Sequence, residues 1–202
     1  MTVASAPEIA ERYRRICDEV GKGVTVVVAT KYVSVEEMAS LAEAGVEVVG
    51  ENRAQDLVAK HARYTDAFRW HFIGHLQSNK VKVVNPICEL VHSLSSDSAA
   101  RRLTVPALLE INFSGEATKS GVAPEEAAEL VRRYPLIRGL MTMPPLTEDP
   151  EASRPYFRRL RELADELGLP ELSMGSSQDY RVAVEEGATL VRVGEILFRD
   201  RR

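Results

Sequence analysis

The feature of this 202-residue chain that most constrains its fold is a regular alternation of short apolar runs with amphipathic segments. The runs are rich in β-branched residues and have the length of buried parallel strands. We count eight of them: Val24–Ala29, Val46–Val49, Trp70–Ile73, Leu90–Ser93, Val105–Asn112, Ile137–Met141, Leu172–Met174 and Thr189–Val193. Strands that alternate with helices predict a parallel sheet, because each crossover returns the chain to the same edge.

Residues typical of helix starts and ends indicate where the helices lie. The segment Val35–Ala44 follows Ser34, and Glu37 completes a capping box with that serine before Gly45 ends the helix. Proline opens the predicted helix Pro124–Tyr134, as is common in a first helical turn. The other predicted helices are Ala6–Val20, which precedes the first strand, Ser153–Leu167, which ends at Gly168, and Gln178–Glu186, which ends at Gly187.

We predict a single (β/α)8 TIM-type barrel over residues 1–202, with an extra N-terminal helix, because eight is the number of parallel strands that closes such a barrel. An open doubly wound sheet is the alternative, since periodicity alone does not close a barrel. One connection, Ser95–Thr104, has only about ten residues, whereas a crossover usually needs a dozen or more. Either its helix is a stub or residues are absent from the sequence.

Composition and charge narrow the classes of function. With 45% hydrophobic and 28% charged residues, the chain has the balance of a soluble globular protein. The net charge of -4 gives no electrostatic reason to expect nucleic acid or an anionic membrane as partner. The only two cysteines, Cys17 and Cys88, are far apart, which fits a reducing cytoplasm better than a disulfide scaffold.

No apolar run approaches the roughly 18 residues that a membrane helix needs, and residues 1–11 contain no signal-peptide core. We therefore expect a cytoplasmic protein. A monomer is the default expectation, because no long apolar surface stripe appears outside the barrel helices.

Lys31 is the first residue to weigh for chemistry. It follows the apolar run of the first predicted strand, at the end where parallel α/β barrels form their sites. A lysine that emerges from a desolvated strand can serve as the nucleophilic amine of a Schiff base. The structural alternative is a lysine whose ammonium group simply reaches solvent at a strand end.

The last predicted strand carries Arg192, a charge inside an apolar run that needs an anionic or hydrogen-bonding partner. Gly194 follows it and allows close approach to the backbone. The preceding turn contains Ser176 and Ser177, whose hydroxyls and backbone N–H groups lie before a predicted helix. Barrels frequently bind phosphate with the loops after strands seven and eight, so these residues form a candidate anion pocket. The alternative is an ordinary helix cap and a turn glycine.

Polar residues also gather after four other predicted strands, which favours a ligand site over scattered turns. His71 and His75 are four residues apart, but nearby carboxylate or cysteine ligands are lacking, so we do not expect a metal site. The polar segments are Gly50–Gln55, Gly74–Lys80, Asn112–Glu116 with Lys119–Gly121, and Met141–Pro145.

Taken together, these motifs resemble those of the pyridoxal phosphate homeostasis proteins, the YggS/PROSC group, whose barrel is similar to the N-terminal domain of alanine racemase. They arrive in the family's order and cover nearly the whole chain. The matching motifs are Ala29–Lys31, Gly50–Asn52, His71–Lys80, Ile111–Asn112, Ser114–Glu116, Lys119–Gly121, Gly139–Met143, Ser173–Gly175, Ser177 with Asp179, and Val191–Gly194.

The resemblance implies that the chain binds pyridoxal 5′-phosphate as a Schiff base on Lys31. By the same resemblance, Ser177 and the Gly194 backbone would bind the phosphate, and Arg192 would face the pyridine nitrogen. It also places Asn52 close to the ring and Met141 along its face. Ser176 is predicted to bind the cofactor as part of the candidate anion pocket. Two departures from the family are the short Ser95–Thr104 segment and Arg199, where the family tends to have glycine.

Three functions compete. The resemblance implies a carrier that holds pyridoxal phosphate without significant turnover, and either passes it to apoenzymes that depend on it or keeps the free aldehyde low. An amino-acid racemase is the second, but racemisation needs two bases, and no residues after Arg202 could build the β domain that supplies the second base in those racemases. The third is a barrel enzyme for another phosphorylated metabolite. A bound Schiff base is also chemically competent for weak side reactions.

Overall fold

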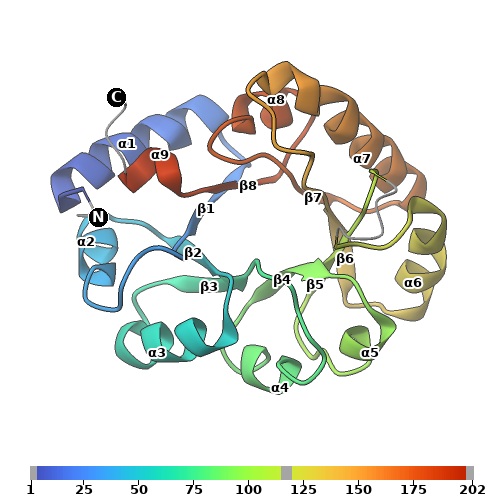
Figure 1. The fold of residues 1–202 in the computed structure, drawn as a ribbon, viewed down its shortest axis with the longest axis horizontal. Coiled ribbons are helices and arrows are strands. Elements are labelled where there is room, and N and C mark those ends of the chain that lie inside the picture. Colours follow the sequence, from blue (N-terminus) through green and yellow to red (C-terminus); the bar gives the residue numbers. More distant parts are fainter. Residues whose placement is uncertain (1–3, 115–119, 199–202) are drawn as a thin grey trace.

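The computed structural model describes residues 4–114 and 120–198. Eight strands form a closed parallel barrel in chain order, and β8 pairs with β1 (Figure 1). The closed ring confirms the predicted TIM-type barrel and rules out the open sheet. The strands are β1 (Thr25–Ala29), β2 (Val48–Glu51), β3 (Arg69–Phe72), β4 (Leu90–Leu94), β5 (Ala107–Glu110), β6 (Ile137–Met141), β7 (Glu171–Ser173) and β8 (Leu190–Val193).

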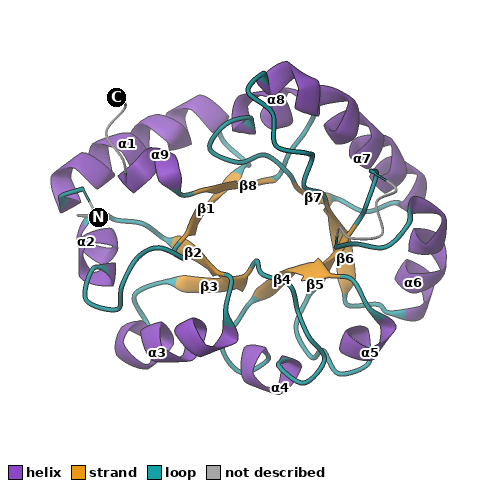
Figure 2. Ribbon diagram, in the orientation of Figure 1, coloured by secondary structure: helices purple, strands orange, loops and turns teal. Residues whose placement is uncertain are grey.

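Helices form an outer ring around the strands (Figure 2). The predicted helix before the first strand is confirmed as α1, which lies beside α9 outside β1 and β8 (Figure 1). The helices are α1 (Ala6–Val20), α2 (Met38–Glu43), α3 (Ala54–Tyr64), α4 (Val81–Val84), α5 (Asp97–Ala100), α6 (Ala127–Arg133), α7 (Arg154–Leu167), α8 (Tyr180–Glu185) and α9 (Glu195–Phe198), with 3-10 turns η1 (Pro124–Glu126) and η2 (Pro150–Ser153).

Helix α2 begins at Met38, three residues later than predicted. The capping box is present, because the N–H of Ser34 donates to Glu37 Oε2 at 2.7 Å and the N–H of Glu37 donates to Ser34 Oγ at 3.2 Å. The N–H groups of Ala39 and Ser40 bond to carbonyls three residues back, so the first turn is 3-10-like rather than α-helical.

The short connection after β4 is closed by α5, a helix of four residues. Ser96 caps it by accepting a hydrogen bond from the N–H of Ala99 at 3.3 Å. The hydroxyl of Tyr134, after α6, donates to the carboxylate of Asp97 and ties the stub to its neighbour. The crossover is therefore a short helix in this barrel.

The barrel has two apolar layers. Side chains that point outward from the strands pack against the helices and form the larger core. Inward-pointing side chains fill the barrel axis with a smaller cluster: Val27, Val48, Leu90, Leu108, Met141 and Leu190. The interior is therefore a packed core, as expected for an eight-stranded barrel.

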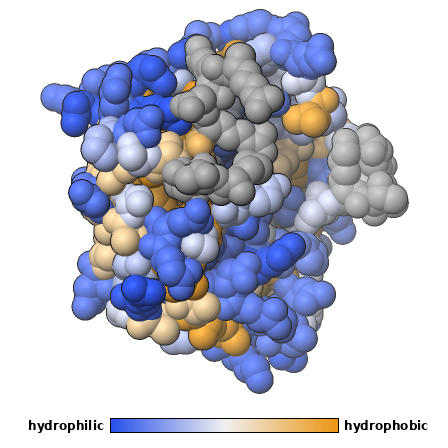
Figure 3. All heavy atoms as spheres, turned by 60° about the vertical axis from the view of Figure 1, so that its left-hand side comes forward, coloured by the Kyte–Doolittle hydropathy of each residue, from blue (hydrophilic) through white to orange (hydrophobic). Residues whose placement is uncertain are grey.

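The face that Figure 3 shows is largely hydrophilic, with hydrophobic side chains in small groups. Among the described residues, none of the helices is both long and apolar enough to span a bilayer. Cys17 and Cys88 are not joined in a disulfide, and Cys88 is buried.

Candidate functional site

Six of the seven predicted site residues lie on four neighbouring strands or directly after them. Lys31 follows β1 and Asn52 follows β2, on one side of the barrel mouth. Ser176 and Ser177 lie between β7 and α8, and Arg192 lies in β8 with Gly194 directly after it. Since β7, β8, β1 and β2 are consecutive in the barrel, these residues gather at one side of the mouth.

Lys31 is exposed at the barrel mouth, with Nζ 4.8 Å from the ring centroid of Tyr32. The residue before it, Thr30, is fully buried. Lys31 is thus the first exposed residue after β1, and its amine is open to a ligand that enters the mouth.

A buried ion pair holds this end of β1 in place. Lys60 Nζ in α3 lies 2.5 Å from Glu51 Oε2 in β2, and the two side chains are at most 4% exposed. The same lysine donates to the carbonyl of Thr30 at 2.8 Å, and the Thr30 hydroxyl donates to Glu51 at 2.8 Å. Four polar groups therefore fix the backbone one residue before Lys31.

Asn52 is attached to the same network. Its N–H donates to Glu51 Oε1 at 2.7 Å. Its side-chain Oδ1 is buried and has no hydrogen-bond partner among the described residues. Buried polar atoms are rarely left without a partner, so this amide is a candidate ligand contact.

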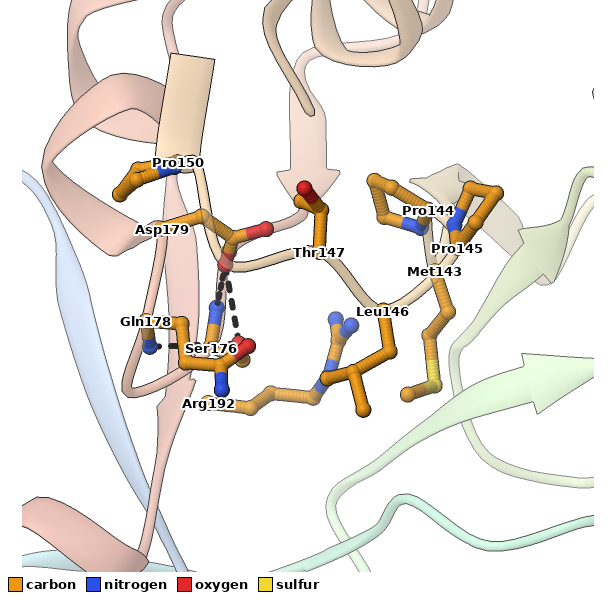
Figure 4. A pocket seen from close by; sticks show the side chains of 11 residues that line it. Met143, Pro144, Pro145, Leu146, Thr147, Pro150, Ser176, Gln178, Asp179 and Arg192 are labelled. Atoms are coloured by element: carbon orange, nitrogen blue, oxygen red, sulfur yellow. Dashed lines mark hydrogen bonds between the residues drawn. The ribbon is translucent and has the colours of Figure 1, made fainter. Parts of the chain in front are cut away.

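The turn after β7 is shaped by Gly175 and Asp179. Gly175 has φ +90°, and a Cβ there would lie 2.6 Å from Ala183 Cβ and 2.8 Å from Tyr180 Cα. The carboxylate of Asp179 accepts hydrogen bonds from the N–H and the hydroxyl of Ser176, at 2.7 and 2.9 Å (Figure 4). Glycine is thus required at position 175, and the aspartate fixes the loop that carries both serines.

Ser177 and Gly194 contact each other. The N–H of Gly194 donates to Ser177 Oγ at 3.1 Å, which leaves the serine hydroxyl hydrogen available to a ligand. A Cβ on Gly194 would lie 3.2 Å from the carbonyl oxygen and 3.3 Å from Cβ of Ala29 in β1. The glycine therefore also allows close packing of the chain after β8 against the strand that leads to Lys31.

Arg192 has the partners that its place inside an apolar strand requires. Its Nη1 donates to Ser173 Oγ, and its Nη2 donates to the carbonyl of Thr142 at 3.2 Å. Burial lowers the pKa of Arg192 to about 10, although the carboxylates of Glu110 and Asp179 oppose that shift. Arg192 therefore keeps a positive charge at neutral pH.

A cavity of about 140 Å³, here the mouth cavity, lies beside this arginine (Figure 4). It is lined by residues 143–147 after β6, by Pro150, by Gly175, Ser176, Gln178 and Asp179 of the turn after β7, and by Arg192. Of the predicted residues, it brings together Ser176 and Arg192. Met141 does not line it, because its side chain is 1% exposed and belongs to the inner cluster.

The two histidines considered as metal ligands lie in different environments. His71 is buried in the barrel interior, whereas His75 is exposed and lies 3.3 Å from Ser120 Oγ. Across residues 4–114 and 120–198, no cluster of three potential metal ligands is found.

Sequence reasoning missed Lys60, which forms the buried ion pair, and His92 inside the barrel, and it gave no role to Glu51 and Ser173, which it named only as members of motifs. His92 and Ser173 each occupy an alternate strand position whose side chain points into the barrel, as Arg192 does in β8. A polar residue at such a position within an apolar run is the signal that could have identified them. Lys60 could not have been found, because it reads as one more charge on an amphipathic helix. Gly115, Glu116, Lys119 and Arg199 lie outside the described residues.

Comparisons with known proteins show the family to which this barrel belongs. Residues 5–202 match the family model of the alanine racemase N-terminal domain, which defines the class of barrel. The chain is 42% identical to the pyridoxal phosphate homeostasis protein of Aquifex aeolicus, over 96% of both chains, and 38% identical to that of Pseudomonas aeruginosa, over 96% of this chain and 93% of the other. The chain belongs to the pyridoxal phosphate homeostasis protein family.

Solved structures give the same result. PipY of Synechococcus elongatus, solved with PLP bound, superposes with a TM-score of 0.86 at 31% identity, over 95% of this chain and 100% of PipY. A lysine/ornithine decarboxylase of Vibrio vulnificus superposes with a TM-score of 0.74 at 14% identity, over 96% of this chain and 62% of that enzyme, which shows a shared fold alone.

Proposed function

We propose that this chain binds pyridoxal 5′-phosphate at the barrel mouth, with Lys31 as its covalent anchor, and serves as a carrier of the cofactor. The observation that carries the proposal is the adjacency of β8 and β1. It places Arg192 and Gly194 beside β1, the strand that leads to Lys31, with Val27 opposite Arg192 in the pairing. A family whose relatives are named homeostasis proteins, and PipY with its bound PLP, support the same assignment.

The residues present fit this cofactor. The orphaned amide oxygen of Asn52 needs a polar partner, and the free hydroxyl hydrogen of Ser177 suits a phosphate oxygen. The Ser176 N–H and hydroxyl both donate to Asp179, so Ser176 would shape the loop that carries Ser177, and Arg192 supplies a positive charge. Phosphate, aldehyde and ring would therefore each meet a complementary group.

Each of these residues would have a separate role in binding the cofactor. When bound, the cofactor supplies an aldehyde that condenses reversibly with a primary amine. Lys31 Nζ is the amine, and the Glu51–Lys60 pair holds its backbone in place. Arg192 disfavours a proton on a pyridine nitrogen that it faces, because two positive charges would repel each other. Met141 lies below the mouth and would support the ring from the barrel interior.

Carrier, racemase and phosphate-barrel functions are separated by two assays. Absorbance titration of the purified protein with pyridoxal phosphate should give a visible band, absent in Lys31→Ala while the far-UV circular dichroism is unchanged. Alanine racemisation by the loaded protein should stay at the level of free cofactor. A colourless protein favours the phosphate-barrel alternative, and racemisation abolished by Lys31→Ala would establish the racemase.

The proposal also covers the cellular compartment and the oligomeric state of the protein. A carrier would pass the cofactor to apoenzymes in the cytoplasm, and two cysteines without a disulfide suit that compartment. A monomer is proposed because the large exposed hydrophobic residues of the described chain lie on four separate segments: Tyr32, Val58, Leu136, and Met143 with Leu146 on the loop after β6. Sedimentation equilibrium tests the oligomeric state, and a stable dimer would contradict this part.

A further inference from the structure

A chain of buried polar side chains crosses the interior of the barrel. His71 Nδ1 in β3 lies 2.9 Å from His92 Nε2 in β4, and His92 Nδ1 lies 2.7 Å from Ser173 Oγ in β7. Arg192 Nη1 in β8 donates to that same serine oxygen. The two histidines and the serine are at most 2% exposed. Since β3 and β4 face β7 and β8 across the barrel (Figure 2), the chain connects opposite walls.

The far end of this chain borders a second cavity, at the N-terminal ends of the strands. This floor cavity has a volume of about 460 Å³ and is lined by His71. It also contains two ion pairs, between Arg69 and Glu89 at 2.8 Å and between Arg138 and Glu171 at 3.1 Å. His71 is therefore at the end of the barrel opposite the proposed cofactor.

The donors and acceptors give the chain a direction. Arg192 donates to Ser173 Oγ, so the serine hydroxyl hydrogen needs an acceptor, and His92 Nδ1 is the one within reach. A neutral imidazole that accepts at Nδ1 carries its hydrogen on Nε2, so His92 donates to His71 Nδ1. His71 then carries its own hydrogen on Nε2. The reverse direction would leave the Ser173 hydroxyl without any acceptor among the described residues.

Both rings are neutral at pH 7, which this direction requires. Burial, with a smaller contribution from Arg69, lowers the pKa of His71 to about 4. Burial, His71 and Arg192 lower the pKa of His92 well below its usual value. A serine that donates to His92 is also a better acceptor for Arg192, because hydrogen bonds in a chain polarise one another.

We propose that His71 and His92 are positioning residues for Arg192: they orient the Ser173 hydroxyl and thereby hold the guanidinium at the cofactor end of the barrel. This inference rests on the proposed function for its effect on the cofactor. The direction of the hydrogen bonds in the chain does not depend on whether the cofactor is bound. His71 thus acts on the mouth from the barrel floor, without touching the cofactor.

The first test uses the protein without cofactor. Nitrogen-15 NMR of labelled histidines, assigned by single substitutions of the four histidines, reports which ring nitrogen carries the hydrogen. We expect His71 and His92 to be neutral with the hydrogen on Nε2. Finding His92 with its hydrogen on Nδ1, or either ring charged at pH 7, overturns the proposal whether or not any variant folds.

The second test varies the acceptor. His71→Asn places an amide near the position of Nδ1 and should keep the wild-type direction, whereas His71→Leu removes the acceptor and should move the hydrogen of His92 to Nδ1. In the loaded protein, His71→Leu should shift the absorbance maximum of the bound cofactor and weaken binding about fivefold, the fold-change of roughly one hydrogen bond. Thr25 lines the same floor cavity but takes no part in the chain of hydrogen bonds. Thr25→Val should therefore have the absorbance maximum and the cofactor affinity of the wild type.

The outcomes separate the two proposals. A wild-type protein that forms no visible band refutes the cofactor function, and the NMR result still decides the direction of the chain. A wild-type band with an unchanged spectrum and affinity in His71→Leu refutes the positioning role. Equal effects in His71→Leu, His71→Asn and Thr25→Val would refute it too, because they would reflect general disturbance of the floor.

Discussion

Ser177 and Gly194 are joined by a single hydrogen bond of 3.1 Å between two loops of the barrel mouth. The serine accepts from the glycine N–H and keeps one donor for a ligand. Ser177→Ala should therefore weaken pyridoxal phosphate binding by about tenfold, the effect of one hydrogen bond to a charged group. Equilibrium titration by absorbance measures the change.

Ser98→Ala is the matched control, because Ser98 is an exposed serine on α5. It should bind the cofactor like the wild type. If Ser177→Ala also binds like the wild type, the assignment of Ser177 to the phosphate is wrong.

The site residues that sequence reasoning could find are those that stand at the ends of strands. Lys31 and Gly194 follow apolar runs directly, and position alone predicts that they face the mouth of a barrel. The partners of Arg192 could not be predicted in the same way. Which inward-pointing side chains meet across the barrel depends on strand stagger, and a run such as Leu90–Leu94 gives no measure of stagger.

At the scale of elements, the turn between β7 and α8 depends on Gly175, whose φ is +90° and whose Cβ position is occupied by Ala183 and Tyr180. Gly175→Ala should destabilise the fold by roughly 3 kcal/mol, from overpacking together with backbone strain. Because the turn carries both serines, cofactor affinity should fall as well. Thermal unfolding and absorbance titration measure the two effects.

Gly168→Ala separates strain from overpacking. Gly168 ends α7 with φ +67°, and a Cβ there would meet no atom within 4 Å. This variant should lose only about 1 kcal/mol and keep its cofactor affinity. Equal losses of affinity in both variants would argue that the Gly175 turn has no special role in binding.

The pair formed by Glu51 and Lys60 joins α3 to the end of β1. Lys60→Met should cost roughly 3–5 kcal/mol, since it leaves a carboxylate buried without its partner. Lys60→Met combined with Glu51→Gln should recover part of that loss. Chemical denaturation of the single and double variants checks this, and a fully additive double variant would show that the two residues are not coupled.

The eight strands and the helices α1, α2, α6, α7 and α8 were predicted from the sequence, but α3, α4 and α9 were given no bounds, and some predicted boundaries differ from the structure. Helix α1 has the predicted bounds, Ala6–Val20, and Gly21 follows its last residue. Helix α2 begins late, because its first hydrogen bonds span three residues rather than four. Strand β5 begins after Pro106, which has no N–H to donate to the sheet, although the apolar run begins at Val105.

For the whole molecule, two buried neutral histidines make stability depend on pH. The unfolded chain takes up protons near pH 6.5, whereas folded His71 resists protonation down to about pH 4. The free energy of unfolding should therefore fall as the pH falls through this window, and the contribution of His71 alone is a loss of roughly 3 kcal/mol that is complete below about pH 4. His92, which is also buried and neutral, adds to the effect.

Urea denaturation at a series of pH values tests this dependence. His71→Asn removes one titrating ring and should flatten the profile between about pH 6.5 and about pH 4. His75→Asn changes an exposed histidine and should leave the profile unchanged. A profile that is identical in His71→Asn and the wild type would show that His71 does not account for the dependence.

The central claim is that Lys31 anchors pyridoxal phosphate, and reductive trapping tests it most directly. The loaded protein is treated with borohydride, digested and mapped by mass spectrometry. The account predicts one dominant adduct on Lys31, with the visible band lost on reduction. An adduct on another lysine, or spread over many surface lysines with Lys31 unmodified, would contradict it.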